Sequence, residues 1–385
     1  DLYQISAMQS RRVLGPWPHF LQLDLASGDF NGDGRNEVVA SFSSPSLNNS
    51  PKQRLKLAIA ETDSTGNLDW DPALAIDLDL GPIDVAHDIS VAPGTVQIIT
   101  GNFDEDEQTE FAVFFLLLDP RHSFVRGYVC ELDSTGTEVQ FQQLPEDNFQ
   151  NSLGWSESER FAAAAGDLNG DGIDEIVMVY TTLHNGSPPD FAHVLRTYFR
   201  VAGDWTLGPQ KDGMDTGWDY GNWKPNWLFL HDTNELDHDR LACAVGTAQN
   251  GDSRQPYNAV AATARKWTGY QTPIFSSDAF LWIFRLDASD PPNILQDEFT
   301  HLPTITSPLH PYWKVTNPSL GLEVGDLNFD GNDEVVLTAQ DQLRVYDVTA
   351  DTGILSATEI ATHPRTAPYN DSSRRNVQIE DLDAD

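Results

Sequence analysis

The chain has 385 residues, enough for one large domain or two ordinary ones, and 39% of them are hydrophobic, as in globular proteins. Its 59 acidic and 23 basic residues give a formal net charge of −36. Such a negative field disfavours nucleic acid and anionic membrane surfaces as partners. No apolar run has the length of a membrane-spanning helix, so we expect no membrane insertion within this chain.

Three details of the sequence bear on the setting of the protein. The chain begins at Asp1 without a Met or a charged-then-apolar leader, which indicates a mature or trimmed product. Cys130 and Cys243 lie in apolar, strand-like runs, which predicts buried thiols rather than a disulfide. N-x-S/T sequons permit glycosylation in an extracellular setting and occur at Asn48, Asn185 and Asn370.

One pattern recurs along the chain: a Gly, a nine-residue polar loop, and then a run of β-branched and aromatic residues. It reads GDFNGDGRNEVV from Gly28, GDLNGDGIDEIV from Gly166 and GDLNFDGNDEVV from Gly325, with a looser copy, GNFDEDEQTEFA, from Gly101. A fifth copy, DTNELDHDR, starts at residue 232, and the chain stops within a sixth, DLDAD, that starts at residue 381. We number the nine loop positions as places 1 to 9, so place 1 falls at 29, 102, 167, 232, 326 and 381.

Between the loops, strand-like runs alternate with turn residues. In the first repeat the runs are 21–29, 37–42, 55–62 and 73–80, and DSTGN at 63–67 recurs as DSTGT at 133–137 in hairpin turns before the fourth strand. No segment shows helical periodicity over the length of a helix. Four antiparallel strands repeated every 60–70 residues or so predict an all-β fold, a β-propeller of four-stranded antiparallel blades.

We predict a single β-propeller domain over 1–385, with blade repeats that start near residues 20, 95, 159, 226, 318 and 376. The long interval after residue 232 predicts an insertion at about 249–278, and the last repeat is truncated. Propellers close with roughly four to eight blades. Either the natural chain continues past Asp385 or a blade without a loop lies between 232 and 326, and we favour a longer chain with six or seven blades.

The loops place oxygen-bearing side chains at places 1, 3, 5 and 9, a Gly that lets the backbone turn at place 6, and a backbone carbonyl at place 7. So many hard oxygens suit Ca²⁺ better than Mg²⁺, and the three well-formed loops lack the thiols and imidazoles that zinc prefers. An EF-hand would need an acid at place 12 between helices, where Ala40, Met178 and Leu337 stand in strand-like runs. A metal-free Asx-rich turn is the alternative for any single loop, and the repetition favours calcium.

These loops resemble the FG-GAP/VCBS repeats of integrin α-subunit-like β-propellers, in which D-x-[DN]-x-D-G-x-x-[DE] loops join the first two strands of a blade and bind Ca²⁺. The resemblance implies three calcium sites, with place 7 giving its carbonyl, although place 9 is Glu here rather than Asp. The implied ligands are Asp29, Asn31, Asp33, Arg35 and Glu37, then Asp167, Asn169, Asp171, Ile173 and Glu175, and then Asp326, Asn328, Asp330, Asn332 and Glu334.

Two copies depart from this pattern. The looser copy offers Asn102, Asp104, Asp106, Gln108 and Glu110, but Asn stands at place 1 and Glu107 replaces the Gly of place 6, which leaves a fourth calcium site open. In the copy at 232–240, Leu236 removes a ligand and Arg240 introduces a cation that we expect to pair with Asp232, so we expect no metal there.

The recurrence of the loops favours structural ions at blade hairpins rather than one active site. The resemblance implies adhesion, or the binding of a glycan or protein partner, at an extracellular or cell-surface location. The best candidate ligand-binding residues are the aromatic residues of GWDYGNWKPNW at 217–227, namely Trp218, Tyr220, Trp223 and Trp227. Their rings can stack on sugars or anchor a protein partner, and the alternative is that they pack between blades. A second candidate cluster, in the predicted insertion, contains Arg265, Lys266, Trp267 and Tyr270, and the alternative there is a structural flap.

An enzyme is the competing interpretation. The ten histidines are scattered, and the sequence has no H-E-x-x-H, G-x-S-x-G or phosphate-loop motif. A pair of acids for glycoside chemistry cannot be singled out among 59. We therefore predict a binding or assembly module without catalytic residues, and the alternative is the propeller domain of a polysaccharide-active lyase or hydrolase, or of a secreted toxin.

Overall fold

A computed structural model describes the strands and most of the loops that join the first two strands of a blade. The described residues are 23–44, 54–62, 68–70, 76–78, 90–91, 96–104, 106, 108–118, 123–134, 136, 138–145, 161–169, 171–184, 190–212, 240–250, 257–271, 274–286, 294–301, 305–308, 320–328, 333–339, 342–351 and 354–364. All regular structure in these residues is β-strand. Within them, no helix has the length and apolarity needed to cross a membrane.

The first three repeats form three separate antiparallel sheets, in which most strands pair with the strand next to them in the chain. The first sheet contains β1 (Leu23–Gly28), β2 (Glu37–Ser44), β3 (Arg54–Thr62), β4 (Leu68–Trp70) and β5 (Ile76–Leu78). The second contains β6 (Ser90–Val91), β7 (Gln97–Gly101), β8 (Glu110–Leu118), β9 (Ser123–Leu132) and β10 (Val139–Gln143). The third contains β11 (Phe161–Gly166), β12 (Glu175–His184), β13 (Asp190–Val201) and β14 (Asp204–Asp212).

The remaining strands belong to two further repeats that a short parallel pairing between β15 and β22 joins into one sheet. The fourth repeat contains β15 (Arg240–Asn250), β16 (Tyr257–Gln271), β17 (Ile274–Leu286), β18 (Ile294–His301) and β19 (Ile305–Pro308). The fifth contains β20 (Leu320–Gly325), β21 (Glu334–Ala339), β22 (Gln342–Asp351) and β23 (Ile354–Pro364).

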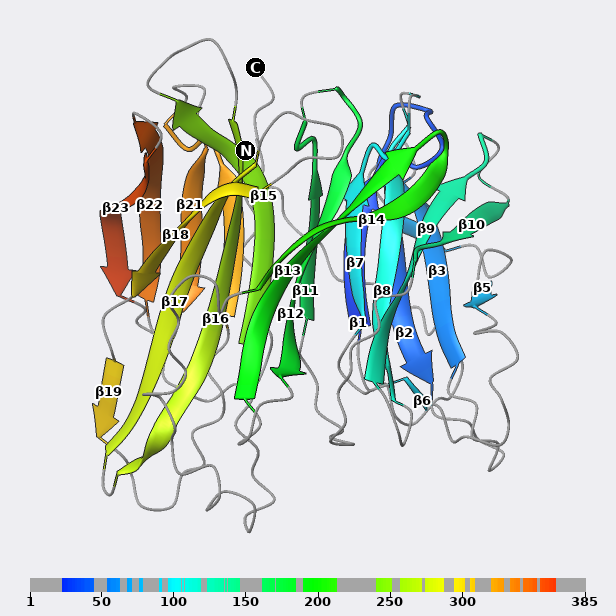
Figure 1. Ribbon diagram of the computed structural model, residues 1–385. Helices are drawn as coiled ribbons and strands as arrows, with labels where there is room; N and C mark the ends of the chain where they lie inside the picture. The colour runs from blue at the N-terminus through cyan, green and yellow to red at the C-terminus, as the bar shows by residue number, and fades with distance from the viewer. Residues whose placement is uncertain are drawn as a thin grey trace, which may run out of the picture.

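The repeats stand side by side as blades, and each repeat contributes one inner strand (Figure 1). These inner strands contact one another in chain order: β1 with β7, β7 with β11, β11 with β15, and β15 with β20. Radially arranged, four-stranded antiparallel meanders are the blade arrangement of a β-propeller. The predicted all-β propeller class is therefore confirmed.

The fourth repeat differs from the others in two ways. β15 follows the predicted loop at 232–240, yet it takes the inner place that the strand before the loop takes in the other blades. The predicted insertion at 249–278 is also divided, because residues 257–265 pair with β15 as a regular blade strand. Described residues within 266–271 and 274–278 lengthen the hairpin of β16 and β17 beyond β15. The loops at 232–240 and 381–385 lie outside the described residues, except for Arg240 at the start of β15.

Two clusters of buried side chains fill the space between the first three blades. One joins the first and second blades and includes Phe30, Leu57 and Phe111, with the rings of Phe30 and Phe111 packed edge to face at 5.1 Å. The other joins the second and third blades, and there Phe103 packs edge to face on Trp205 at 5.7 Å. Both Phe30 and Phe103 stand at place 2 of a loop, so the loops are anchored in the core. Cys130 is buried in the first cluster, whereas Cys243 is only partly buried, and both are free thiols.

Backbone hydrogen bonds connect each of these loops to the next. The N–H of Thr109, at place 8, donates to the carbonyl of Asp29, at place 1 of the preceding blade, at 3.0 Å. The N–H of Asp174, again at place 8, donates to the carbonyl of Asn102, again at place 1, at 2.6 Å. The loops of the first three blades therefore form one hydrogen-bonded series.

The glycine before each loop permits this close approach. A Cβ on Gly28 would lie 2.8 Å from Cε1 of Phe30 in its own loop and 2.9 Å from Cγ2 of Thr109 in the next blade. A Cβ on Gly101 would lie 2.8 Å from both Phe103 and the Asp174 carboxylate. The repeated Gly is therefore a packing requirement between blades.

We expect Gly28→Ala to lower the free energy of unfolding by about 1–3 kcal/mol, the usual cost of overpacking. Because Thr109→Ser removes the methyl that the new Cβ would meet, the double variant should lose less than the sum of the two single variants. Ser27→Ala, at an exposed position of the same strand, is the control. Chemical denaturation measures all four, and an unchanged Gly28→Ala would contradict the packing account.

Candidate metal centre

A buried glutamate closes the base of each described loop. Place 9 pairs with the glycine before the loop across the first two strands of the blade, as in Gly28↔Glu37 and Gly101↔Glu110. The four glutamates are 1–4% exposed, and one carboxylate oxygen of each accepts the backbone N–H of place 2. These N···O distances are 2.9, 2.5, 2.8 and 2.8 Å for Glu37, Glu110, Glu175 and Glu334. The side chain of place 9 therefore reaches back across the loop to place 2.

The loop at 29–37 folds around its first aspartate. The two oxygens of Asp29 accept the N–H groups of Asp33 and Gly34 at 3.0 and 2.8 Å, and Asn31 Oδ1 also accepts from Asp33, at 2.9 Å. Gly34 adopts a left-handed φ of 83°, which is the turn predicted for place 6. The loop at 167–175 repeats these bonds at 2.8–3.1 Å, with Gly172 at φ 90°. Places 1, 3, 5 and 6 therefore take equivalent positions in both loops.

In three loops the side-chain amide of the asparagine at place 3 donates a hydrogen bond to the second carboxylate oxygen of the buried glutamate. Its Nδ2 donates to Oε1 at 3.3 Å for Asn31, 2.8 Å for Asn169 and 2.7 Å for Asn328. The glutamate of each of these loops is thus satisfied by protein donors. Asp330 and Asn332 of the third loop lie outside the described residues.

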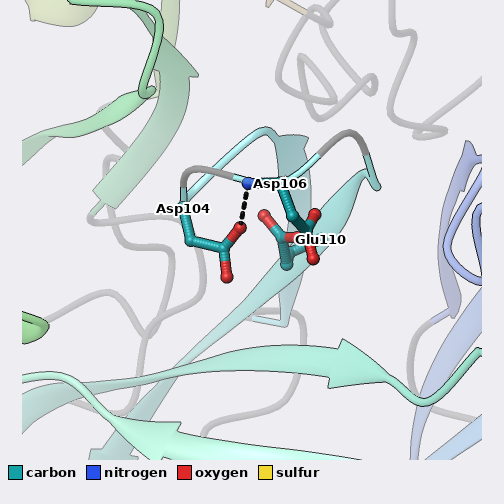
Figure 2. Close-up of side chains that lie close together, drawn as sticks. All are labelled: Asp104, Asp106 and Glu110. Carbon is teal, nitrogen blue, oxygen red and sulfur yellow. Dashed lines mark hydrogen bonds between the residues drawn. The ribbon is translucent and has the colours of Figure 1, made fainter.

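The loop at 102–110 lacks this amide because place 3 is Asp104. Glu110 is 3% exposed, and its Oε1 has no hydrogen-bond partner. Asp104, Asp106 and Glu110 each offer a carboxylate oxygen within 4.8 Å of the others, and Figure 2 shows the three carboxylates converging beneath the loop. In the part of the chain that the structure describes, these are the three acids brought together in this way.

Further unpartnered polar atoms surround the same loop. Oδ1 of Asn102 and Oε1 of Gln108 are buried without a hydrogen-bond partner. So is Nε1 of Trp205, whose ring packs on Phe103. Among the described residues, four of the five buried side-chain atoms without a partner therefore lie on this loop or against it. Buried oxygens without donors are costly, and a cation would satisfy them.

Burial controls the charge of the glutamates. Desolvation raises the pKa of Glu37 to about 7, and that of Glu110 and Glu175 to about 8, while the N–H bond from place 2 partly offsets the shift and nearby aspartates add to it. Burial raises the pKa of Asp174 as well. A bound cation would favour the ionised forms, so metal and protons should compete for these sites.

Sequence reasoning missed the residues of the third blade that contact this loop. Nη1 of Arg200 donates to the carbonyl of Phe103 at 2.9 Å and lies 3.6 Å from Oδ2 of Asp104. Asp174 accepts the N–H of Asn102 at 2.8 Å. Arg200 belongs to no motif, and Asp174 stands at place 8 of the loop at 167–175, but both are far from the loop at 102–110 along the chain, so the sequence carries no signal for these contacts.

The structure describes the place-12 residues of the loops, but not the candidate ligand-binding residues or the sequons. Ala40, Met178 and Leu337 lie in strands β2, β12 and β21, which confirms that the loops are not EF-hands. The candidate ligand-binding residues Trp218, Tyr220, Trp223 and Trp227 lie outside the described residues, as do the sequons at Asn48, Asn185 and Asn370.

No family model and no curated protein matches the sequence. Among solved structures, a mutant of the Aleuria aurantia lectin in complex with alpha-methyl-L-fucoside aligns with 90% of this chain and 96% of its own, at 10% identity and a TM-score of 0.29. The fucose-specific lectin from Aleuria aurantia aligns with 90% of this chain and 97% of its own, at 10% identity and a TM-score of 0.28. Similarity at this level supports no inference about the fold or the ligand of this chain.

The raised pKa values predict that the metal-free protein loses stability as pH rises. A folded-state pKa above the unfolded value near 4.5 means that the native state binds more protons. The stability that Glu110 contributes is complete below about pH 4.5 and is lost as pH rises through about 8. In chelator, Glu110→Gln should therefore be more stable than the wild type at pH 8 and should show a weaker decline between pH 5 and pH 8.

Denaturant unfolding across this pH range in chelator checks the prediction, since each pKa unit corresponds to about 1.4 kcal/mol. Glu138→Gln is the control, because it removes the same charge from an exposed position in the turn between β9 and β10. Equal pH slopes for the wild type and Glu110→Gln would contradict it.

Proposed function

We propose that the protein is a calcium-stabilised β-propeller of the FG-GAP/VCBS type, with ions held in the loops between the first two strands of its blades. The observation that carries the proposal is the group of unpartnered, buried oxygens in the loop at 102–110, where three carboxylates converge. Carboxylate and amide oxygens in such number form the ligand set that Ca²⁺ prefers. In this loop the ligands are drawn from Asn102, Asp104, Asp106, Gln108 and Glu110.

The three regular loops are proposed as calcium sites on their equivalent composition. Their aspartate oxygens accept backbone N–H groups, yet each carboxylate oxygen has further lone pairs with which it can bind a cation. The side-chain ligands are those at places 1, 3, 5 and 9, and the carbonyls are those of Arg35, Ile173 and Asn332. In these loops the ion has to compete with the place-3 amide for the buried glutamate, as between Asn169 and Glu175.

The proposed ions have a structural role. They offset part of the net charge of −36, and they stabilise the native state by mass action where calcium is abundant. Extracellular modules bind calcium weakly, in keeping with such surroundings. We therefore propose an extracellular or cell-surface protein that binds a glycan or a protein partner, with Trp218, Tyr220, Trp223 and Trp227 as candidate contacts.

Chelation tests the ion. Excess EDTA should lower the Tm by several degrees, since saturating a site about a hundredfold above its Kd adds about 2.7 kcal/mol. Added Ca²⁺ should restore the Tm, and Mg²⁺ at the same concentration should restore less of it, because Mg²⁺ gives up its water reluctantly. Differential scanning calorimetry measures the shift, and an unchanged melting curve in EDTA would exclude the calcium proposal.

A separate measurement tests the binding role. The protein should be retained on an array of glycans or extracellular-matrix proteins in Ca²⁺ and released by EDTA, with the mass of every ligand unchanged. Trp223→Ala should weaken retention if the 217–227 aromatics form the contact, and Trp70→Ala, in the first blade, serves as the matched aromatic control. New reducing ends or unsaturated sugars would instead indicate an enzyme.

A further inference from the structure

The hairpin of β13 and β14 brings the third blade into contact with the loop at 102–110 of the second blade. Figure 1 shows these two long strands reaching across toward β9 and β10, and Gln142 Nε2 of β10 donates to the carbonyl of Gly203 in the hairpin turn at 3.3 Å. Trp205 of β14 packs on Phe103 of the loop at 102–110. The loop is therefore bordered by another blade on the side from which Arg200 approaches.

Arg200 is held in place on both sides of its guanidinium. Nε donates to the carbonyl of Gly203 in its own hairpin at 3.2 Å, and Nη1 donates to the carbonyl of Phe103 at 2.9 Å. The same Nη1 lies 3.6 Å from Oδ2 of Asp104, with both side chains only about one-quarter exposed. A fixed positive charge thus stands beside one of the three convergent carboxylates.

This position has two consequences for the loop. The hydrogen bond to Phe103 and the attraction to Asp104 hold the loop in its folded form when no ion is bound. The same positive charge repels a divalent cation bound to the Asp104 carboxylate. This repulsion is larger than that between two unit charges at the same distance. A group so close to a ligand changes ion affinity through charge as well as through geometry.

We propose that Arg200 is a positioning residue that weakens calcium binding at the loop at 102–110 while keeping the loop in contact with the third blade after the ion leaves. This inference rests on the calcium binding proposed above. The convergent carboxylates, together with the unpartnered Oε1 of the buried Glu110, identify this loop as an ion site apart from its acidity. Arg200 then makes it a low-affinity site whose occupancy follows the free calcium concentration.

Calcium titration calorimetry of the full chain, stripped of metal beforehand, tests this inference. Arg200→Gln should bind one equivalent of Ca²⁺ about tenfold more tightly than the wild type, because it removes the repelling charge. Arg200→Lys keeps the charge without the planar fork, so its affinity should stay within about twofold of the wild type. In chelator, Arg200→Gln should melt at a lower temperature, since the bond to Phe103 is lost.

Two further variants separate local from global effects. Arg196→Gln makes the same change in net charge on the same strand, at a guanidinium that donates to the carbonyl of Gly208 in its own blade at 3.3 Å. It should leave calcium affinity within about twofold of the wild type. Glu110→Gln should remove this binding event, and with it the gain produced by Arg200→Gln.

The outcomes distinguish the two proposals. Equal or weaker binding by Arg200→Gln, or an equal gain from Arg196→Gln, would overturn the role of Arg200. Calcium binding that Glu110→Gln does not change would place the ions in other loops and would likewise overturn it, leaving the calcium-stabilised propeller intact. No calcium binding by the wild type or by any variant would remove the proposed function and this inference together.

Discussion

A carboxylate buried beneath the first hairpin of a blade is the interaction on which the loops depend. It recurs in the four described loops, always paired across the strands with a glycine and always bonded to the N–H of place 2. Burying a carboxylate is costly unless its oxygens find donors or a cation. Three of the loops supply an asparagine amide, and the fourth, with Asp104 in that position, supplies none that the described residues reveal.

The same loops hold the blades together. In the first three blades, place 2 sends a buried side chain into the core (Phe30, Phe103 and Leu168), whereas Leu327 of the fifth repeat is exposed. Place 8 of the second and third blades donates to the preceding loop, and the glycine leaves room for the neighbouring blade. The inner strands add side-chain bonds of their own, since Asp24 accepts the N–H of Ile98 at 2.6 Å and Gln97 exchanges two bonds with Ala163. A change at one loop therefore alters contacts between blades, so an ion bound there would stabilise the stack as well as the hairpin.

The sequence predicts whatever is local to one repeat. Places 1 to 9, the hairpin strands around them and the turn at Gly34 and Gly172 follow from residue type and spacing, and the structure contains them. Contacts between blades were beyond prediction, because Arg200 meets Phe103 across 97 positions of the chain. The sequence also ranked the loop at 102–110 below its regular copies for lacking an Asp and a Gly. In the structure, that loop is the one among those described in which the place-3 amide is missing and Glu110 Oε1 has no hydrogen-bond partner.

Diffraction from crystals grown with terbium, a calcium substitute with strong anomalous scattering, would show whether an ion binds among the carboxylates of the loop at 102–110. We expect an anomalous peak among the carboxylates of Asp104, Asp106 and Glu110, at about 2.3–2.6 Å from their oxygens, as for calcium. Displacement of that peak by excess Ca²⁺ would show that the site accepts the physiological ion. Carboxylates with no peak between them, or a peak only at exposed acids away from the loops, would contradict it.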